Sequence, residues 1–249
     1  MTRQRSIFIS AFLLSCAFFP APSFAMKDRA EVEARVRADV TEDLVSLWQP
    51  ESLTGRFCLD GRPVADFPGD VVEFWINLEC PYCGILEPIQ AQRRNFDICI
   101  VPRHIPSLEY GESMKKALGY EALKSFSVNA ANMFWNRVIP KKTDPLPLPY
   151  EGSLLLAFQE AAIDPDAFGE ALSFEASEII SQDIMDAQGR FYVVPTWVLD
   201  GIRFPACEFT AAQIPIALEL AKKARAGDEN ALERVITLIT NALMREPMM

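Results

Sequence analysis

Two cysteines at C-x-x-C spacing, Cys80 and Cys83, limit the possible folds of this 249-residue chain more than any other feature. They follow a continuous apolar run, residues 71–78 (VVEFWINL), which is typical of a short strand buried on both faces. After Cys83, apolar residues recur at helical spacing from position 85 to position 91 and predict a helix that ends near position 95. The pair is therefore predicted to lie at a turn between a buried strand and a helix.

That position suits thiol chemistry at Cys80. Free backbone N–H groups and the positive end of the helix dipole favour a thiolate over a thiol. The pKa of a cysteine at such a site falls from about 8.5 to roughly 3.5–7.5. We therefore expect Cys80 to be the nucleophile and Cys83 to resolve the mixed disulfide. Pro81 suits a first helical turn because that position needs no N–H donor.

A structural zinc site is the alternative use of a C-x-x-C pair. Such a site needs four ligands. The chain has no second C-x-x-C pair and only one histidine, His104, so we expect neither a metal nor another cofactor. His104 itself is expected to be structural, held by backbone groups at the end of a strand.

The first 25 residues have the pattern of a cleavable export signal. Two arginines precede an apolar run over residues 7–19, and small residues at Ser23 and Ala25 mark a cleavage site. The mature chain is then expected to begin near Met26, in an oxidising compartment such as the periplasm. A lipid-anchored N-terminus at Cys16 is the less favoured alternative, because the apolar run continues past that cysteine.

Composition excludes several classes of partner. The formal charge is −10, and it becomes −12 without residues 1–25, which carry two arginines and no acidic residue. Such an acidic chain is poorly suited to bind nucleic acid or an anionic membrane. Half of the residues are hydrophobic, enough for a sizeable core, and no stretch after residue 25 is long enough to span a bilayer.

A second motif lies far downstream, around Val194-Pro195-Thr196. Two short β-rich runs flank Asp200-Gly201, the dipeptide most typical of a tight hairpin, and Pro195 opens the first of them. A cis Val194–Pro195 bond there would expose a backbone edge to a polypeptide substrate. An ordinary trans proline at the start of a strand is the alternative.

The combination of C-P-x-C on a strand-helix turn with a later V-P-T-x-x-x-D-G hairpin resembles the DsbA family of bacterial periplasmic thiol:disulfide oxidoreductases, over residues 63–209. Val194 before the proline also matches that family, whereas DsbC-type isomerases usually have threonine there. The resemblance implies exported protein substrates with thiols or disulfides, and a redox partner protein that recycles the pair. It assigns catalytic roles to Cys80, Cys83 and Pro195, and substrate binding to Pro81, Tyr82 and Val194.

The resemblance also implies an α/β thioredoxin fold with an inserted helical domain and helical extensions at both ends. The predicted division is a signal peptide over 1–25, an N-terminal helix over 26–50, a thioredoxin-like domain over 51–106 and 188–249, and a helical domain over 107–187. Asp164-Pro165 predicts a helix start inside the insertion. Further helical signals are an i+4 stripe of Met114, Leu118, Ala122 and Phe126, the pair Ile180 and Ile184, and buried Phe134 and Trp135.

The two ends of the mature chain are predicted to be helical. Val36, Val40, Leu44 and Trp48 form an apolar stripe that is expected to pack on the same chain, with homodimerisation as the alternative. Near the C-terminus, the capping-box pattern Thr210 to Gln213 and a later Asp228 each predict the start of a helix.

Several residues depart from the DsbA-like pattern. Glu73 resembles the family's buried acid but stands seven positions before Cys80, where six is usual, so strand alternation should turn it to the opposite face. Either a local bulge corrects its position or the role of the acid is lost. Tyr82 replaces the histidine of the strongest oxidants. Pairing of Cys58, Cys99 and Cys207 stays open: the first two are expected on neighbouring strands and could bond, or remain buried thiols.

Three functions are therefore compatible with the sequence. The first is a DsbA-like enzyme that introduces or exchanges disulfides in exported proteins. The second is a DsbC-type isomerase or reductase. The third is a non-enzymatic chaperone or assembly factor for an exported apparatus, with the cysteines in a structural role.

Overall fold

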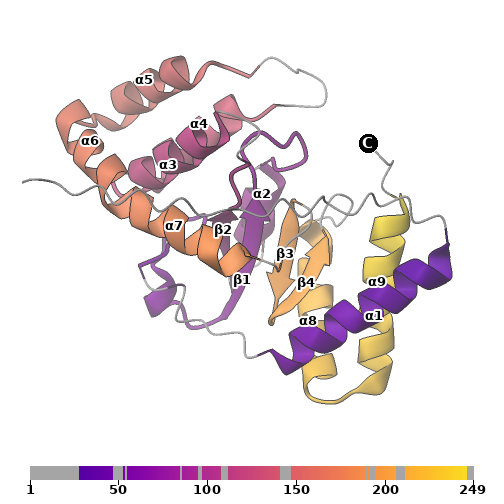
Figure 1. The fold of residues 1–249 in the computed structure, drawn as a ribbon. Coiled ribbons are helices and arrows are strands. Elements are labelled where there is room, and N and C mark those ends of the chain that lie inside the picture. Colours follow the sequence, from indigo (N-terminus) through magenta and orange to yellow (C-terminus); the bar gives the residue numbers. More distant parts are fainter. Residues whose placement is uncertain are drawn as a thin grey trace, which may run out of the picture.

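A four-stranded mixed sheet forms the centre of the fold (Figure 1). The structure is a computed structural model that describes residues 28–46, 53, 55–84, 86–94, 97–107, 112–140, 147–188, 190, 194–205 and 211–245. The predicted signal peptide over 1–25 and Cys207 lie outside these residues. The strand order is β2-β1-β3-β4, with β1 and β2 parallel and the other pairs antiparallel. The strands are β1 (Asp70–Ile76), β2 (Ile98–His104), β3 (Thr196–Leu199) and β4 (Ile202–Pro205).

Strand β1 is the predicted buried strand, and its two faces have different surroundings. Val72, Phe74 and Ile76 belong to the main hydrophobic core. Trp75 belongs to a separate small cluster, and Glu73 pairs with a buried arginine. Because side chains alternate along a strand, these two sets face opposite sides of the sheet. The strand therefore receives helices on both faces, as its continuous apolar sequence predicted.

The strand expected over residues 56–59 is not formed. Phe57 makes only an isolated bridge to Pro63, while the Leu59 N–H donates to the Ile100 carbonyl at 2.9 Å. A disulfide joins Cys58 to Cys99 of β2, with a Cα–Cα separation of 5.2 Å. The covalent bond thus attaches this loop to the sheet where a full strand ladder is missing. Of the two alternatives for Cys58 and Cys99, the structure has the disulfide and not two buried thiols.

The predicted hairpin is confirmed. Asp200 and Gly201 connect β3 and β4 with positive φ angles of 48° and 79°, as expected for a tight turn whose twist matches the strands. The Val194–Pro195 peptide bond is cis, and Pro195 directly precedes β3 rather than lying in it.

Five helices lie between β2 and β3 in the chain and gather on one side of the strands (Figure 1). The side chain of Asp164 accepts hydrogen bonds from the N–H groups of Asp166 and Ala167, which confirms the predicted helix start. The helices are α3 (Ser113–Lys124), α4 (Val128–Val138), α5 (Tyr150–Ala161), α6 (Pro165–Ser173) and α7 (Glu175–Ala187).

Two of the apolar stripes predicted in this segment are each wrong at one residue, whereas Ala122 and Ile180 are buried as expected. Phe126 and Ile184 are each 42% exposed, although both were expected on buried faces. Helix α3 instead buries Tyr120 and Leu123 together with polar residues such as Lys116. Hydrophobic spacing fails to identify the buried face of this helix, because several of the buried side chains are charged and form ion pairs.

Three further helices of the described residues lie on the other side of the strands (Figure 1). They are α1 (Arg29–Val45), α8 (Ile214–Arg225) and α9 (Glu229–Arg245). Val36 and Val40 of α1 are buried in the main core, and α1 packs on α9 and β4 of the same chain. Asp228 caps α9 through the Ala231 N–H, as predicted, while α8 starts at Ile214 after a short 3-10 turn. Trp48 and Thr210 lie outside the described residues.

Among the helices of the described residues, none has both the length and the hydropathy needed to cross a membrane.

A buried ion cluster joins the sheet to α7. Arg103 of β2 is fully buried and pairs with Glu73 of β1 at 2.7 Å and with Asp183 of α7 at 2.5 Å. It also pairs with Asp186. Asp183 in addition binds Arg56 at 2.5 Å and accepts the His104 backbone N–H at 2.8 Å. One carboxylate thus connects the loop before β1, the end of β2 and α7.

A second buried cluster joins β2 to α3. The His104 ring Nε2 lies 2.9 Å from Glu121 Oε1, and Lys124 Nζ lies 2.7 Å from Glu121 Oε2. His104 is therefore structural as expected, but its ring is held by a carboxylate rather than by the backbone. Burial alone would raise the pKa of Glu121, yet Lys124 and the contact with His104 outweigh it and place that pKa below its usual range.

Replacing Asp183 tests the first cluster. Asp183→Asn keeps the side-chain shape but leaves two buried guanidinium groups short of a countercharge, so we expect a loss of about 3 kcal/mol in the free energy of unfolding. Urea denaturation measures it. The control is Asp39→Asn, which breaks a surface pair with Arg35 and should cost less than about 0.5 kcal/mol. Similar costs for both variants would contradict the role given to Asp183.

The second cluster predicts that the unfolding free energy depends on pH in the acidic range. A carboxylate with a folded pKa below its unfolded value stabilises the fold at pH above the unfolded value and loses this effect as the pH falls. The unfolding free energy should therefore drop between about pH 5 and pH 3, and drop less steeply in Glu121→Gln, which starts from a lower stability. Exposed Glu31→Gln should keep the wild-type slope. Parallel curves for wild type and Glu121→Gln would rule out this contribution.

Candidate redox site

A tight turn carries both cysteines. Asn77, the first residue after β1, accepts the Cys80 N–H with its carbonyl at 2.9 Å and the Glu79 N–H with its side-chain Oδ1 at 2.8 Å. The Cys83 N–H donates to the Cys80 carbonyl at 3.0 Å. Pro81 is therefore the second residue of a four-residue turn, the position that its fixed φ favours.

The helix after the pair begins later than the sequence predicted. Residues 80–84 are not helical, and the first described residue of α2 (Leu86–Arg94) is six positions after Cys80. The influence of a helix dipole is confined to its first turn. Cys80 is therefore not part of the first turn of α2, and Pro81 belongs to a turn rather than to a first helical turn.

The two sulfur atoms have different surroundings. Both cysteines are thiols in this structure; Cys80 is half-buried and Cys83 is buried. Cys80 Sγ lies 3.5 Å from the carbonyl oxygen of Val194, and Cys83 Sγ accepts the Asn77 N–H at 3.5 Å. Cys80 thus offers a partly accessible sulfur while the Cys83 sulfur is protected. This arrangement suits nucleophilic attack at the first sulfur and resolution of the mixed disulfide by the second.

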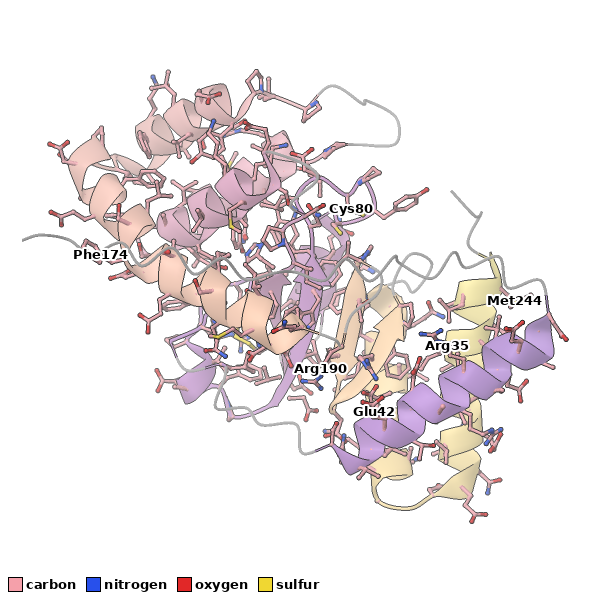
Figure 2. All side chains as sticks on the ribbon, viewed as in Figure 1. Arg35, Glu42, Cys80, Phe174, Arg190 and Met244 are labelled. Carbon is pink, nitrogen blue, oxygen red and sulfur yellow. A yellow bond between two sulfur atoms is a disulfide. The ribbon has the colours of Figure 1, made fainter. Side chains whose placement is uncertain are left out.

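The structure brings together the residues singled out from the two sequence motifs. Cys80 and Val194 are in contact although 114 positions separate them. Pro81 is exposed and Tyr82 is half-buried, whereas Pro195 is buried beside β3. Figure 2 shows Cys80 between the group of helices α3–α7 and the group formed by α1, α8 and α9.

Three side chains from α3 and α4 hold this turn, and no local sequence pattern indicates their contacts. Trp135 Nε1 donates to the Cys83 carbonyl at 2.9 Å. Ser113 Oγ donates to Asn77 Oδ1 at 2.8 Å. Lys116 Nζ lies 2.5 Å from Glu79 Oε1. The prediction that Phe134 and Trp135 are core residues is confirmed, since both are fully buried.

Glu73 lies away from the sulfur atoms, as its register predicted. Its carboxylate pairs with Arg103 on the side of the sheet that faces α7. Phe74, one residue closer to Cys80, occupies the other face and stacks on Trp197 with ring centroids 4.0 Å apart. Cys83 belongs to the same hydrophobic cluster as Phe74. An aromatic ring therefore occupies the position at which the DsbA-like pattern has an acid.

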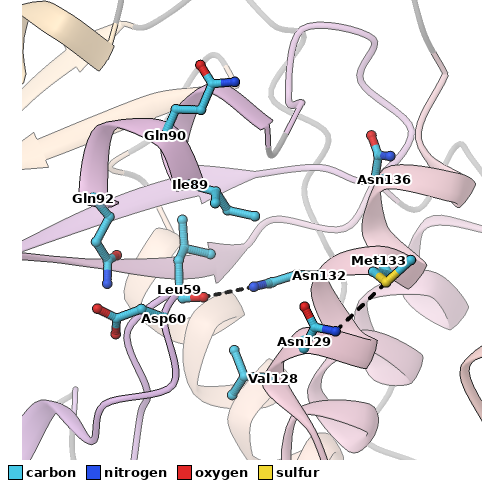
Figure 3. Close-up of a pocket in the computed structure, with 10 residues that line it drawn as sticks. All are labelled: Leu59, Asp60, Ile89, Gln90, Gln92, Val128, Asn129, Asn132, Met133 and Asn136. Carbon is cyan, nitrogen blue, oxygen red and sulfur yellow. Dashed lines mark hydrogen bonds between the residues drawn. The ribbon is translucent and has the colours of Figure 1, made fainter. Parts of the chain in front are cut away.

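A separate pocket of about 470 Å³ lies between α2, the loop at Leu59 and α4 (Figure 3). None of the residues around the sulfur atoms lines it. Asn132 uses its amide internally, donating to the Leu59 carbonyl and accepting from the Tyr120 hydroxyl. The lining residues are Leu59, Asp60, Ile89, Gln90, Gln92, Val128, Asn129, Asn132, Met133 and Asn136.

Within the part of the chain that the structure describes, no group of three or more His, Cys, Asp or Glu side chains is arranged to hold a metal ion.

Sheet order, the dithiol turn after β1 and the cis proline before β3 together define a thioredoxin fold of the DsbA-like type. No protein-family model and no curated protein matches the sequence. Solved structures share the fold at low identity, so they establish the fold alone.

Three such structures can be named. A linker-deletion mutant of ScsC from Proteus mirabilis is 14% identical, covering 79% of this chain and 89% of that chain, with a TM-score of 0.54. A thioredoxin-like oxidoreductase from Silicibacter pomeroyi is 20% identical, covering 71% and 99%, with a TM-score of 0.53. The thiol-disulfide exchange protein alpha-DsbA2 from Wolbachia pipientis is 12% identical, covering 77% and 97%, with a TM-score of 0.50.

The contact between Trp135 and Cys83 can be tested with Trp135→Phe. This change removes the N–H donor and leaves a buried carbonyl without it, so we expect a loss of about 1–2 kcal/mol in unfolding free energy. We also expect faster alkylation of Cys83 in the reduced protein, because the turn loosens.

The matched control is Phe134→Leu, its neighbour on α4. Phe134 packs against Tyr150, so this variant should lose stability while the alkylation rate of folded protein stays unchanged. Equal rates at Cys83 in wild type and Trp135→Phe would contradict the role of the indole.

Proposed function

We propose that this chain is an exported thiol:disulfide oxidoreductase that exchanges disulfides with exported proteins through Cys80 and Cys83. The observation that carries the proposal is the sulfur geometry: a half-buried Cys80 beside the Val194 carbonyl, with Cys83 buried behind it. The DsbA-like fold supports the same reaction class, because the named solved structures include thiol-disulfide exchange proteins.

The proposed reaction begins with the pair oxidised. A substrate thiolate attacks Cys80 Sγ, the Cys80–Cys83 bond breaks, and Cys83 leaves as a thiolate. A second substrate thiolate then attacks the substrate sulfur of the mixed disulfide and displaces the Cys80 thiolate. The substrate gains a disulfide, the pair becomes a dithiol, and a redox partner protein accepts the two electrons when it reoxidises the pair.

Substrate contacts are proposed for Pro81, Tyr82 and Val194. Pro81 is exposed at the tip of the turn and Tyr82 is half-buried beside it. The Val194 carbonyl lies 3.5 Å from Cys80 Sγ, so a polypeptide bound there would present its sulfur to Cys80. We assign Pro195 to the catalytic site because it fixes the backbone next to this carbonyl.

A periplasmic location is part of the proposal. The export signal over residues 1–25 supports it, as does the Cys58–Cys99 disulfide. Structural disulfides persist in oxidising compartments and are rare in the cytosol.

One observation favours a second candidate, an isomerase or reductase. Cys80 does not stand in the first turn of α2, and Tyr82 replaces the histidine of strong oxidants. A less stabilised thiolate makes the disulfide form less oxidising. The direction of exchange would then depend on whether the partner protein keeps the pair oxidised or reduced.

The test uses a substrate protein whose native form contains disulfides, supplied once in reduced form and once with scrambled disulfides. Wild type should form a mixed disulfide and oxidise the reduced substrate. Cys80→Ser should lose at least about 100-fold in rate, because the Cys80–Cys83 disulfide that the substrate thiolate attacks cannot form. Cys83→Ser should accumulate the mixed disulfide through Cys80. Recovery of the scrambled substrate by reduced enzyme would select the isomerase instead.

Cys207→Ser is the matched cysteine control and should keep wild-type rates. A Cys80→Ser variant with full activity would contradict the redox proposal and leave the chaperone hypothesis.

A further inference from the structure

The residue immediately before Cys80 is an acid, Glu79. A carboxylate next to a cysteine disfavours a second negative charge and raises the thiol pKa. The charge of Glu79 is only partly screened, because its side chain is 20% exposed. A countercharge at Glu79 would therefore favour the Cys80 thiolate.

Lys116 supplies that countercharge from α3. Its Nζ lies 2.5 Å from Glu79 Oε1, and its side chain is only 6% exposed. The same Nζ donates to the Val138 carbonyl at 2.9 Å, at the C-terminal end of α4. A helix C-terminus carries partial negative charge that favours a cation. The ammonium group is thus fixed between α4 and the redox turn.

We propose that Lys116 is a positioning residue for the redox turn: by pairing with Glu79 it keeps the Cys80 thiolate stable and sets the reduction potential of the Cys80/Cys83 pair. The inference rests on the proposed function. Lys116 acts through Glu79 and not on the substrate, so it is not a catalytic residue.

The other charged groups of α3 are engaged elsewhere. Lys115 points outward to Glu112 and Glu151 and over the Tyr150 ring. Lys124 and Glu121 pair with each other in the cluster at His104. Among the described ion pairs, Lys116–Glu79 is the one that involves the redox turn itself.

Thiolate titration of four variants tests the inference in the full mature chain. Lys116→Met should raise the Cys80 pKa by about 1 unit, a tenfold loss of thiolate near neutral pH. The pair should become correspondingly less oxidising, by up to tenfold in the equilibrium constant with glutathione, or about 30 mV. Glu79→Gln should shift both quantities the other way.

The double variant Lys116→Met with Glu79→Gln should return close to the wild-type pKa, because both charges are gone. Lys115→Met is the matched control, one position away on α3, and should leave the pKa and the potential unchanged. Absorbance at 240 nm follows the thiolate, and glutathione equilibration gives the potential.

The outcomes separate the two proposals. This inference would be overturned if Lys116→Met lowered the thermal stability but left the Cys80 pKa unchanged, and if Glu79→Gln also left that pKa unchanged. The Lys116–Glu79 ion pair would then be merely structural. Wild-type protein that forms no mixed disulfide at all would instead overturn the proposed function. The Glu79→Gln variant keeps the test valid if Lys116→Met fails to fold.

Discussion

The end of β2 is the point on which the rest of the architecture depends. Arg103 and His104 are consecutive, so their side chains leave opposite faces of the sheet. Arg103 reaches Glu73, Asp183 and Asp186 and fixes α7, while His104 reaches Glu121 and fixes α3. Burying these charges costs desolvation energy that pairing only offsets, so the clusters define one arrangement of helices and sheet more than they add stability.

Fixing α3 in this way determines what surrounds the redox turn. The residue that meets His104, Glu121, lies on the same helix as Ser113 and Lys116, which contact Asn77 and Glu79. Helix α4 packs against α3 and brings Trp135 to the Cys83 carbonyl. A shift of α3 along β2 would therefore move the donors and the cation that hold the cysteine turn. The ion clusters and the sulfur site therefore both depend on the position of α3, although no residue belongs to both.

Local sequence signals predicted the local structure well. The apolar run became β1, Asp200-Gly201 became the hairpin turn, and Asp164 caps its helix, because each depends on neighbouring residues alone. Contacts across the fold were not predictable in this way. The buried face of α3 contains Lys116, Glu121 and Lys124, which no hydrophobic period can identify. The contact between Trp135 and Cys83 joins residues 52 positions apart, and the missing first strand is replaced by a disulfide.

The alternation of side chains along β1 separates its acid from the cysteines. Glu73 faces Arg103, and the site face carries Phe74 against Trp197 and Trp135. Cys83 is packed among these apolar groups, where a leaving thiolate is poorly solvated. The Asn77 N–H lies 3.5 Å from its sulfur, and Asn77 is itself held by Ser113 of α3. The surroundings of both sulfur atoms thus depend on the turn and on the helices that contact it. Substitutions in α3 or α4 that alter these contacts would change the reduction potential of the pair without changing either cysteine.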